Sequence, residues 1–439
     1  MDVDSLLPLL KKIIDGLHSK GISIVSYACD GTEVERGVQR RFLDQFTSKR
    51  TYKIRNPQPG CNDTTVTYGI YNGQAMCMVQ DSKHALKTMR NNLFSGAHLL
   101  VLGNFTATFQ HILLVAQGAG SPLYSRDVNK IDRQDDNAAV RLFSAETLKY
   151  MADNHPEFAG EIVYLFVFGE LIDAYQNRHI PHAERLKLVL RARYFLDLWE
   201  AFLGKCGYRK DHYFISREAE DIIRIIIDGF IALIIIHRDH VRGPLLPWLH
   251  SSEACEHVFG NARQIVKDFT FLDFIYMIPK LRIKLRESVL RGKSSDSKAR
   301  AAGYNHTYFD NEGLDLCVLS TYPSDEEITA IAGQAAQEAN SLISFLGLRP
   351  EDLFSPQAVS SVVRLPGIGA WFQEEEEETV DAGLFENELD DETGDNVELQ
   401  AILDHEENSP ISRRLAIDER CTNLTAAALA MAAEDTSVV

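Results

Sequence analysis

Two short apolar segments near the beginning of the chain each run directly into an aspartate. The first covers residues 21–30 and ends at Asp30, and the second covers residues 75–81 and ends at Asp81. A nearly continuous apolar run is typical of a strand that is buried on both faces and lies in the middle of a sheet. Because the polar residue at the carboxyl end of such a strand points into the ligand crevice, both aspartates are candidate site residues.

Helical apolar spacing dominates the rest of the chain and predicts a mainly α protein with a small β component, an α+β fold. One hairpin is indicated by β-prone runs at 64–71 and 75–79 on either side of an Asn72-Gly73 turn signal. Ser251 is a candidate cap for a helix that carries Glu256. The other expected helices cover residues 6–17, 33–45, 84–102, 105–116, 137–152, 161–175, 183–203, 217–237, 272–290 and 325–346.

The net charge of −18 is concentrated at the end of the 439-residue chain. Residues 356–439 contain 20 acidic and 4 basic residues, a net of −16, so residues 1–355 carry only −2. A basic face on the body, and DNA as a partner, are therefore compatible with the composition. Residues 356–410 cannot bury enough apolar surface to fold, and we expect an acidic disordered tail with a short helix at 413–433.

Cysteine usage and the amino terminus predict a nuclear or cytoplasmic protein that is not secreted. The seven cysteines are scattered and form no C-x-x-C motif, which indicates reduced thiols. Asp2 and Asp4 stand where a signal peptide would be basic, and Pro8 interrupts the apolar run. The most apolar stretch, residues 222–236, is shorter than a bilayer span of about 20 residues and is expected to be a buried helix, with no membrane partner.

Three carboxylates are candidates for holding Mg²⁺, which prefers oxygen ligands from one or two carboxylates together with substrate phosphates. These are Asp30 and Asp81 at the strand ends and Glu256 on its helix. Glu256, Gly260 and Arg263 recur at i, i+4 and i+7, on one helical face where Arg263 could meet a phosphate. The alternatives are that Asp30 belongs only to a turn and that Gly260 ends the helix.

A second helical face follows Asp81 and carries polar and basic groups. His84, Lys87 and Asn91 share this face at i, i+3 and i+7, and Arg90 lies beside them. Such a face near a strand-end carboxylate suits phosphate binding and predicts contacts with nucleic acid. A capped, solvated helix without any binding role is the alternative interpretation.

Four segments then resemble the motifs of P-element-like (THAP-associated) DNA transposases. Residues 81–93 resemble their D-x-x-H-x-x-K-x-x-R-N-x-L motif, and residues 26–31 resemble the V-x-x-x-C-D-G strand end that carries the second catalytic aspartate. Residues 129–144 are similar to the segment before their helical insertion, and residues 252–263 to the E-x-F-F-G-x-x-R helix of the catalytic glutamate. Together these matches extend over about residues 1–290.

The resemblance implies an RNase H-like catalytic core that is split by a large α-helical insertion and acts on DNA with Mg²⁺. On the matching positions, Asp30 would be the second catalytic acid and Glu256 the third. The family's first catalytic aspartate lies on an earlier strand that is not found in this chain, unless Asp81 takes its place beside Asp30. The resemblance also brings in GTP as a lesser candidate ligand, although the insertion has no Gly-x-x-x-x-Gly-Lys loop.

Two functions are expected from these observations. The first is a transposase-derived protein with a degenerate or truncated Mg²⁺-dependent core for DNA cleavage and strand transfer. The second is a non-enzymatic helical scaffold whose acidic tail recruits basic protein partners. Along the chain, we expect the first half of a partial RNase H-like core at residues 1–104 and an α-helical insertion at 105–250. A helix at 251–292 then returns to the core, and a helical extension at 293–355 and the acidic tail at 356–439 follow.

Overall fold

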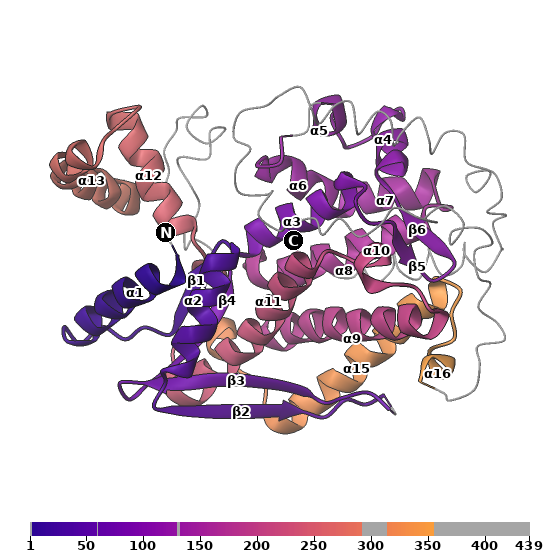
Figure 1. Ribbon diagram of the computed structural model, residues 1–439, viewed down its shortest axis with the longest axis horizontal. Coiled ribbons are helices and arrows are strands. Elements are labelled where there is room, and N and C mark those ends of the chain that lie inside the picture. Colours follow the sequence, from indigo (N-terminus) through magenta and orange to yellow (C-terminus); the bar gives the residue numbers. More distant parts are fainter. Residues whose placement is uncertain (1, 59, 130–131, 292–313, 355–439) are drawn as a thin grey trace.

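The computed structural model describes residues 2–58, 60–129, 132–291 and 314–354. It is mainly helical with a small mixed sheet, which confirms the α+β class (Figure 1). The predicted tail at 356–410 and the predicted helix at 413–433 lie outside the described residues, as does almost all of the expected loop at 292–315.

Four strands form the main sheet in the order β1-β4-β3-β2. β2, β3 and β4 are antiparallel neighbours, whereas β1 pairs with β4 in parallel. Asn72 and Gly73 both have positive φ, as the predicted hairpin turn requires. The strands are β1 (Ser26–Cys29), β2 (Ser48–Ile54), β3 (Thr64–Tyr71) and β4 (Gln74–Gln80).

Helices cover both faces of this sheet. Alternation along β4 sends Met76 and Met78 toward α1 (Val3–His18) and α2 (Glu33–Asp44). The opposite face, with Val79, packs against α11. α11 spans Arg217–Ile236 and includes the apolar stretch expected to be a buried helix, so that prediction is confirmed.

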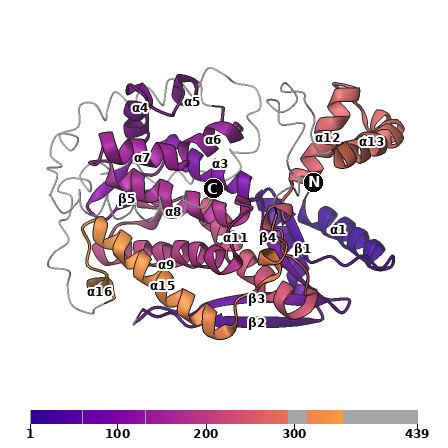
Figure 2. The same cartoon turned by 180° about the vertical axis from the view of Figure 1, so that it is seen from behind.

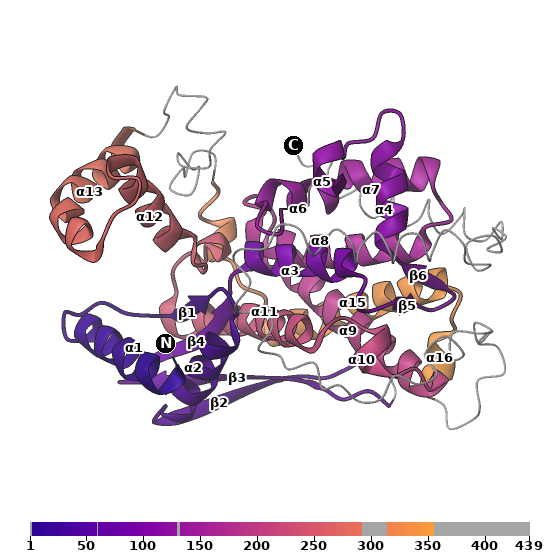
Figure 3. The ribbon, with the colours of Figure 1, turned by 45° about the horizontal axis from the view of Figure 1, so that its top comes forward.

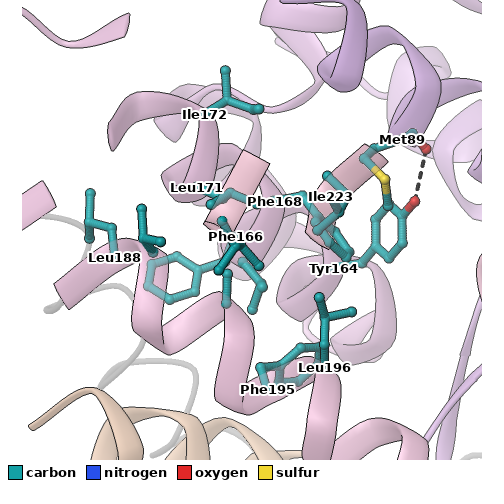
Figure 4. Packing of buried hydrophobic residues seen from close by; sticks show 14 of the residues in the cluster. Met89, Tyr164, Phe166, Phe168, Leu171, Ile172, Leu188, Phe195, Leu196 and Ile223 are labelled. Atoms are coloured by element: carbon teal, nitrogen blue, oxygen red, sulfur yellow. Dashed lines mark hydrogen bonds between the residues drawn. The ribbon is translucent and has the colours of Figure 1, made fainter. Parts of the chain in front are cut away.

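The helical body shares one hydrophobic core with the inner face of the sheet. Figure 4 shows α8, α9, α11 and α3 meeting there, and the Tyr164 hydroxyl donates a hydrogen bond to the Met89 carbonyl at 2.8 Å. α15 packs along α9, so the expected C-terminal extension belongs to the same core (Figure 2). These helices are α3 (Ser82–Ser95), α8 (Ala159–Gln176), α9 (His182–Cys206) and α15 (Asp325–Phe345).

Residues 96–107 differ from the helices expected there. α3 ends at Gly96, which adopts the left-handed conformation, and a small hairpin follows with a turn at Gly103, whose φ is +63°. The helix expected over 137–152 is also broken into two. The elements are β5 (Leu100–Leu102), β6 (Phe105–Ala107), α4 (Phe109–Gln117), α5 (Ser125–Asn129), α6 (Asp136–Leu142) and α7 (Ala145–Asn154).

A pair of helices, α12 (Glu253–Ile265) and α13 (Phe271–Arg291), extends from the body at the end near α1 (Figure 3). Gly260 lies inside α12, so the alternative that it ends this helix is wrong. The remaining short elements are α10 (Lys210–Tyr213), η1 (His237–Val241), η2 (Pro247–Leu249), η4 (Val318–Ser320) and α16 (Pro350–Leu353).

Candidate metal centre

The carboxyl ends of β1 and β4 lie side by side because these strands are parallel neighbours. Cys29 pairs with Gln80 in the ladder, and the Asp81 amide donates to the Cys29 carbonyl at 2.8 Å. Asp30 and Asp81 therefore follow the last paired residues at one edge of the sheet, where the sequence predicted them.

The connection between Asp30 and α2 is closely packed. Gly31 has a φ of +95°, and a Cβ at this position would lie 2.6 Å from the Gln80 side-chain oxygen. Its carbonyl accepts a hydrogen bond from Arg36, which also pairs with Glu218 at 3.0 Å. These contacts fix the backbone at Gly31, directly after Asp30.

Asp81 connects the starts of two helices through one buried carboxylate. Its Oδ1 accepts the amides of Lys83 and His84 at 2.8 and 3.0 Å, which caps α3. Its Oδ2 accepts the amide and the hydroxyl of Ser252 at 2.9 and 3.1 Å, just before α12. Four donors therefore occupy this carboxylate, and Asp81 has a positioning role where the sequence predicted a metal ligand.

An ion pair reinforces the contact between α3 and α12. Lys83 Nζ lies 2.6 Å from Glu253 Oε1, and His257 Nε2 lies 3.5 Å from the same oxygen. Lys83, Ser252 and Glu253 are residues that sequence reasoning did not single out. Their positions close to Asp81 and Glu256 in the sequence could have pointed to them. Which of these residues contact one another depends on tertiary packing.

Asp30, His84 and Glu256 converge at this junction. Their ligand atoms all lie within 4.8 Å of one another, and this is the one such group of three or more found in the described residues. His84 Nδ1 is 3.8 Å from Asp30 Oδ1, while Glu256 Oε1 is 3.2 Å from the Ser252 hydroxyl. The structure therefore brings together the two acids that the sequence paired, and it adds His84, which was expected to contact nucleic acid.

The donor set fits a divalent cation. Within the described part of the chain, Asp30 Oδ1 is buried without a hydrogen-bond partner, which is costly for a carboxylate oxygen unless a cation compensates it. Ligands of one octahedral Mg²⁺ lie roughly 3 to 4 Å apart, since each is about 2.1 Å from the ion. The observed spread needs only a small contraction. Carboxylates suit Mg²⁺ and Mn²⁺, and an imidazole suits transition metals.

The neighbouring thiol does not belong to this ligand set. Cys29 is buried one residue before Asp30, and burial, followed by the charge of Glu35, raises the pKa of its thiol to about 12. At neutral pH the thiol stays protonated, and a metal ligand has to be the thiolate. None of the six cysteines in the described ranges forms a disulfide.

Three of the residues predicted to bind nucleic acid are turned toward the protein instead. Lys87 Nζ pairs with Asp136 at 3.0 Å, and Arg90, 1% exposed, donates to the carbonyls of Asp132 and Asp135 at 3.0 and 3.3 Å. Asn91 donates to the Arg133 carbonyl at 3.4 Å. Their contacts secure residues 132–136 against α3, so the expected solvated or phosphate-binding face is corrected to an internal one.

Burial also has an electrostatic effect on Arg90. Desolvation lowers the pKa of its guanidinium, and the nearby carboxylates Asp135, Asp127 and Asp132 act in the opposite direction. The guanidinium lies 5.2 Å from the centre of the Phe94 ring, a cation–π geometry. Arg263 differs from these residues because it is exposed on α12, two turns beyond Glu256, and its contact with nucleic acid stays a prediction.

None of the helices within the described ranges combines the length and the apolar character that crossing a bilayer requires. Comparison with known proteins adds no relative: no family model, no curated protein and no solved structure matches this chain.

Proposed function

We propose that this chain is a transposase-derived protein whose partial RNase H-like core binds a divalent cation and acts on the phosphodiester backbone of DNA. The observation that carries the proposal is the convergence of Asp30, His84 and Glu256 around a buried carboxylate oxygen without a hydrogen-bond partner in the described part of the chain. A divalent cation bound there would polarise a phosphate oxygen or acidify a water molecule.

The arrangement of the sheet supports this proposal. A parallel strand pair, β1 and β4, ends in two carboxylates, and the sheet continues on one side into antiparallel strands. The chain then passes through the helices α4–α11 before α12 returns Glu256 to the same strand ends. A catalytic core interrupted by a helical insertion would have this order of elements.

The ligand set supports one cation more directly than two. Asp81 is occupied by four hydrogen-bond donors, so it adds no free carboxylate oxygen for a second ion. Mg²⁺ remains the expected physiological ion, and Mn²⁺ is a suitable probe because it accepts both oxygen and imidazole ligands. A guanine nucleotide is a lesser candidate ligand that rests on the family resemblance alone.

A non-enzymatic scaffold is the second candidate function, and a specific observation favours it. Lys87, Arg90 and Asn91 contact residues 132–136, so the cationic groups next to the candidate centre are fewer than the sequence indicated. A scaffold with a structural cation at the same three ligands would need no phosphate-binding face.

Titration of the full-length protein with Mn²⁺, followed by electron paramagnetic resonance, tests the proposed centre. We expect one saturable ion per chain, with affinity reduced about tenfold or more in Asp30→Asn and in Glu256→Gln, because each removes a charged ligand. Glu33→Gln is the matched control, since it removes an equal charge from an exposed position near Asp30 outside the ligand group. No saturable binding, or equal binding in all four proteins, would refute the centre.

Cleavage of a supercoiled plasmid with Mg²⁺ or Mn²⁺ then separates the two functions. Metal-dependent nicking that disappears in Asp30→Asn and Glu256→Gln, but not in Glu33→Gln, supports the enzyme. Saturable metal binding without any nicking supports the scaffold. In both cases a cation at 100 times its dissociation constant should stabilise the native protein by about 2.7 kcal/mol.

A further inference from the structure

Helix α13 is apolar on two opposite faces. Its inner face packs against α12 through Phe274, Met277 and Leu281, which form a small core of their own with Ala262. Its outer face displays Leu272, Tyr276 and Ile283, which are 59%, 74% and 66% exposed. These three residues recur at i, i+4 and i+11, so they lie along one stripe of the helix.

This outer face is unusual for a helix in contact with water. Residues 259–283 contain eight of the seventeen large apolar side chains that are exposed among the described residues. A helix that is apolar all round is normally buried, and a contiguous exposed apolar patch marks a binding surface. The α12–α13 pair extends away from the body in all three views, so the body leaves this face uncovered (Figures 1–3).

Basic residues are interleaved with the apolar stripe. Lys280, Arg282, Lys284 and Arg286 alternate with apolar positions, and residues 274–286 contain no aspartate or glutamate. Three of the four basic side chains are exposed and Lys284 is half-buried. The surface formed by residues 272–286 of α13, here called the α13 surface, therefore suits a partner that is both acidic and apolar.

The chain itself contains a segment of that chemistry. Residues 374–407 include sixteen acidic residues and no lysine or arginine, and apolar residues are interspersed with the acids over residues 384–403. Residues 355–379, which join residues 380–407 to the last described residue, could reach roughly 80 Å when extended. Attachment to the same chain raises the local concentration of the segment to the millimolar range.

We propose that residues 380–407 bind the α13 surface of their own chain, with acidic side chains on Lys280 to Arg286 and apolar side chains on the Leu272–Ile283 stripe. The inference is independent of the metal centre. It gives the acidic segment a basic partner within the chain and shields the cationic part of α13 from other polyanions.

Zero-length carbodiimide cross-linking of the full-length protein tests this contact, because it joins a lysine amine only to a carboxylate that touches it. We expect cross-links from Lys280 and Lys284 to acids of residues 381–407 within one chain. In the variant Leu272→Ser/Tyr276→Ser/Ile283→Ser the yield should fall about tenfold or more, since the apolar contact is lost while both lysines remain. A thermal melt checks that the variant is folded.

Leu9→Ser/Ile13→Ser is the matched control, because it removes exposed apolar residues from α1 and should leave the cross-links unchanged. A mixture of unlabelled and ¹⁵N-labelled protein distinguishes the arrangements. Cross-links between differently labelled chains would show that a second copy of this chain occupies the α13 surface. An unchanged yield in the triple variant would show that the contact rests on charge pairing without the apolar stripe. Either result, or the absence of these cross-links, overturns the proposal, and protection of Lys280 by a DNA duplex in their absence would assign the surface to nucleic acid.

Discussion

A single buried carboxylate, Asp81, determines how the ligand residues of the candidate centre meet. Its two oxygens accept donors from the first turn of α3 and from Ser252, so the start of α12 is fixed relative to that of α3. His84 and Glu256 stand on these two first turns, and Asp30 follows the adjacent strand. Asp30 itself, with a side chain that is 38% exposed, takes no comparable part in the fold.

Replacing Asp81 by alanine should therefore act mainly on stability, whereas replacing Asp30 by alanine should act mainly on metal binding. Asp81→Ala leaves three backbone amides without their acceptor, whereas the Ser252 hydroxyl can still donate to Glu256, and we expect the free energy of unfolding to fall by about 2 to 4 kcal/mol. Asp30→Ala should change it by no more than about 0.5 kcal/mol, because the side chain is half-exposed and Oδ1 accepts no bond from the described residues. Urea unfolding in the presence of EDTA measures both values.

The same two proteins can be compared by Mn²⁺ titration. Asp30→Ala should keep its fold and lose the ion, whereas Asp81→Ala should weaken binding through displacement of α12. If Asp30→Ala proved the more destabilised protein, the division between a positioning carboxylate and a ligand carboxylate would be incorrect.

At the scale of elements, the contact between α11 and β4 brings a helix very close to the backbone of the sheet. Gly229 makes it possible, because a Cβ at this position would lie 2.6 Å from the Met78 carbonyl oxygen. A glycine inside a helix costs about 1 kcal/mol relative to alanine, and here the short distance to the strand backbone compensates. Moving α11 away from β4 would leave a cavity in the core between them.

Gly229→Ala and Gly204→Ala form a matched pair for testing this contact. Gly229→Ala should lower the free energy of unfolding by about 1 to 3 kcal/mol, since α11 has to move away from β4. Gly204 lies in α9, and a Cβ added there would have nothing within 4 Å, so Gly204→Ala should raise the free energy by up to about 1 kcal/mol. Equal effects of the two substitutions in urea unfolding would contradict the packing argument.

Elements that depend on local signals were predictable from the sequence. The Asn72-Gly73 hairpin follows from turn chemistry and is present. The strand before Asp30 is also present, but it covers only Ser26–Cys29 and lies half-buried at the edge of the sheet, so its predicted place in the middle of the sheet is wrong. The hairpin at residues 100–107 was missed, because the short apolar run of β5 is equally compatible with the end of a helix. Its two-residue Gly103-Asn104 loop was the signal that could have revealed it.

The candidate site was predictable only in part, because side-chain direction depends on distant segments. The sequence placed His84, Lys87 and Arg90 near the acids but could not show which of them point inward. Lys87 and Arg90 contact residues 132–136, and this contact forms only when α6 packs on α3. His84, one turn earlier, is left facing Asp30.

At the scale of the whole molecule, a hydrogen bond and a ring stack inside the helical body join segments that are far apart in sequence. His182 at the start of α9 is fully buried, and its Nε2 donates to the Leu319 carbonyl at 2.9 Å. Its ring also stacks on Tyr322, with ring centres 5.1 Å apart. Its Nδ1 is buried without a hydrogen-bond partner among the described residues, so the imidazole is neutral in the folded protein, with its proton on Nε2.

This histidine predicts a loss of global stability in acid. Burial lowers the pKa of His182 to about 4, while the unfolded chain has an ordinary value near 6.5. Its contribution is therefore complete above pH 6.5 and is lost as the pH falls toward 4, since the unfolded state then binds a proton that the folded state does not. Between pH 7 and pH 5 the loss from this residue should be about 2 kcal/mol.

Urea unfolding of the wild type and of His182→Gln at pH 7, 6 and 5 measures this contribution. The variant keeps a side-chain N–H donor but has no titratable ring, so its stability should fall less than that of the wild type over this interval. A pH dependence that is identical in the two proteins would assign the acid sensitivity to other groups.

The bond from Ser252 to Asp81 joins positions 171 residues apart, and this separation has a consequence for biosynthesis. At translation rates of about 5 to 20 residues per second, α3 leaves the ribosome roughly 10 to 30 s before the segment that completes its junction. Until then, a nascent polypeptide offers Asp30 and His84 without their third partner. A chain whose synthesis is arrested before α12 should therefore fail to retain Mn²⁺. A chain arrested after α12 should retain it.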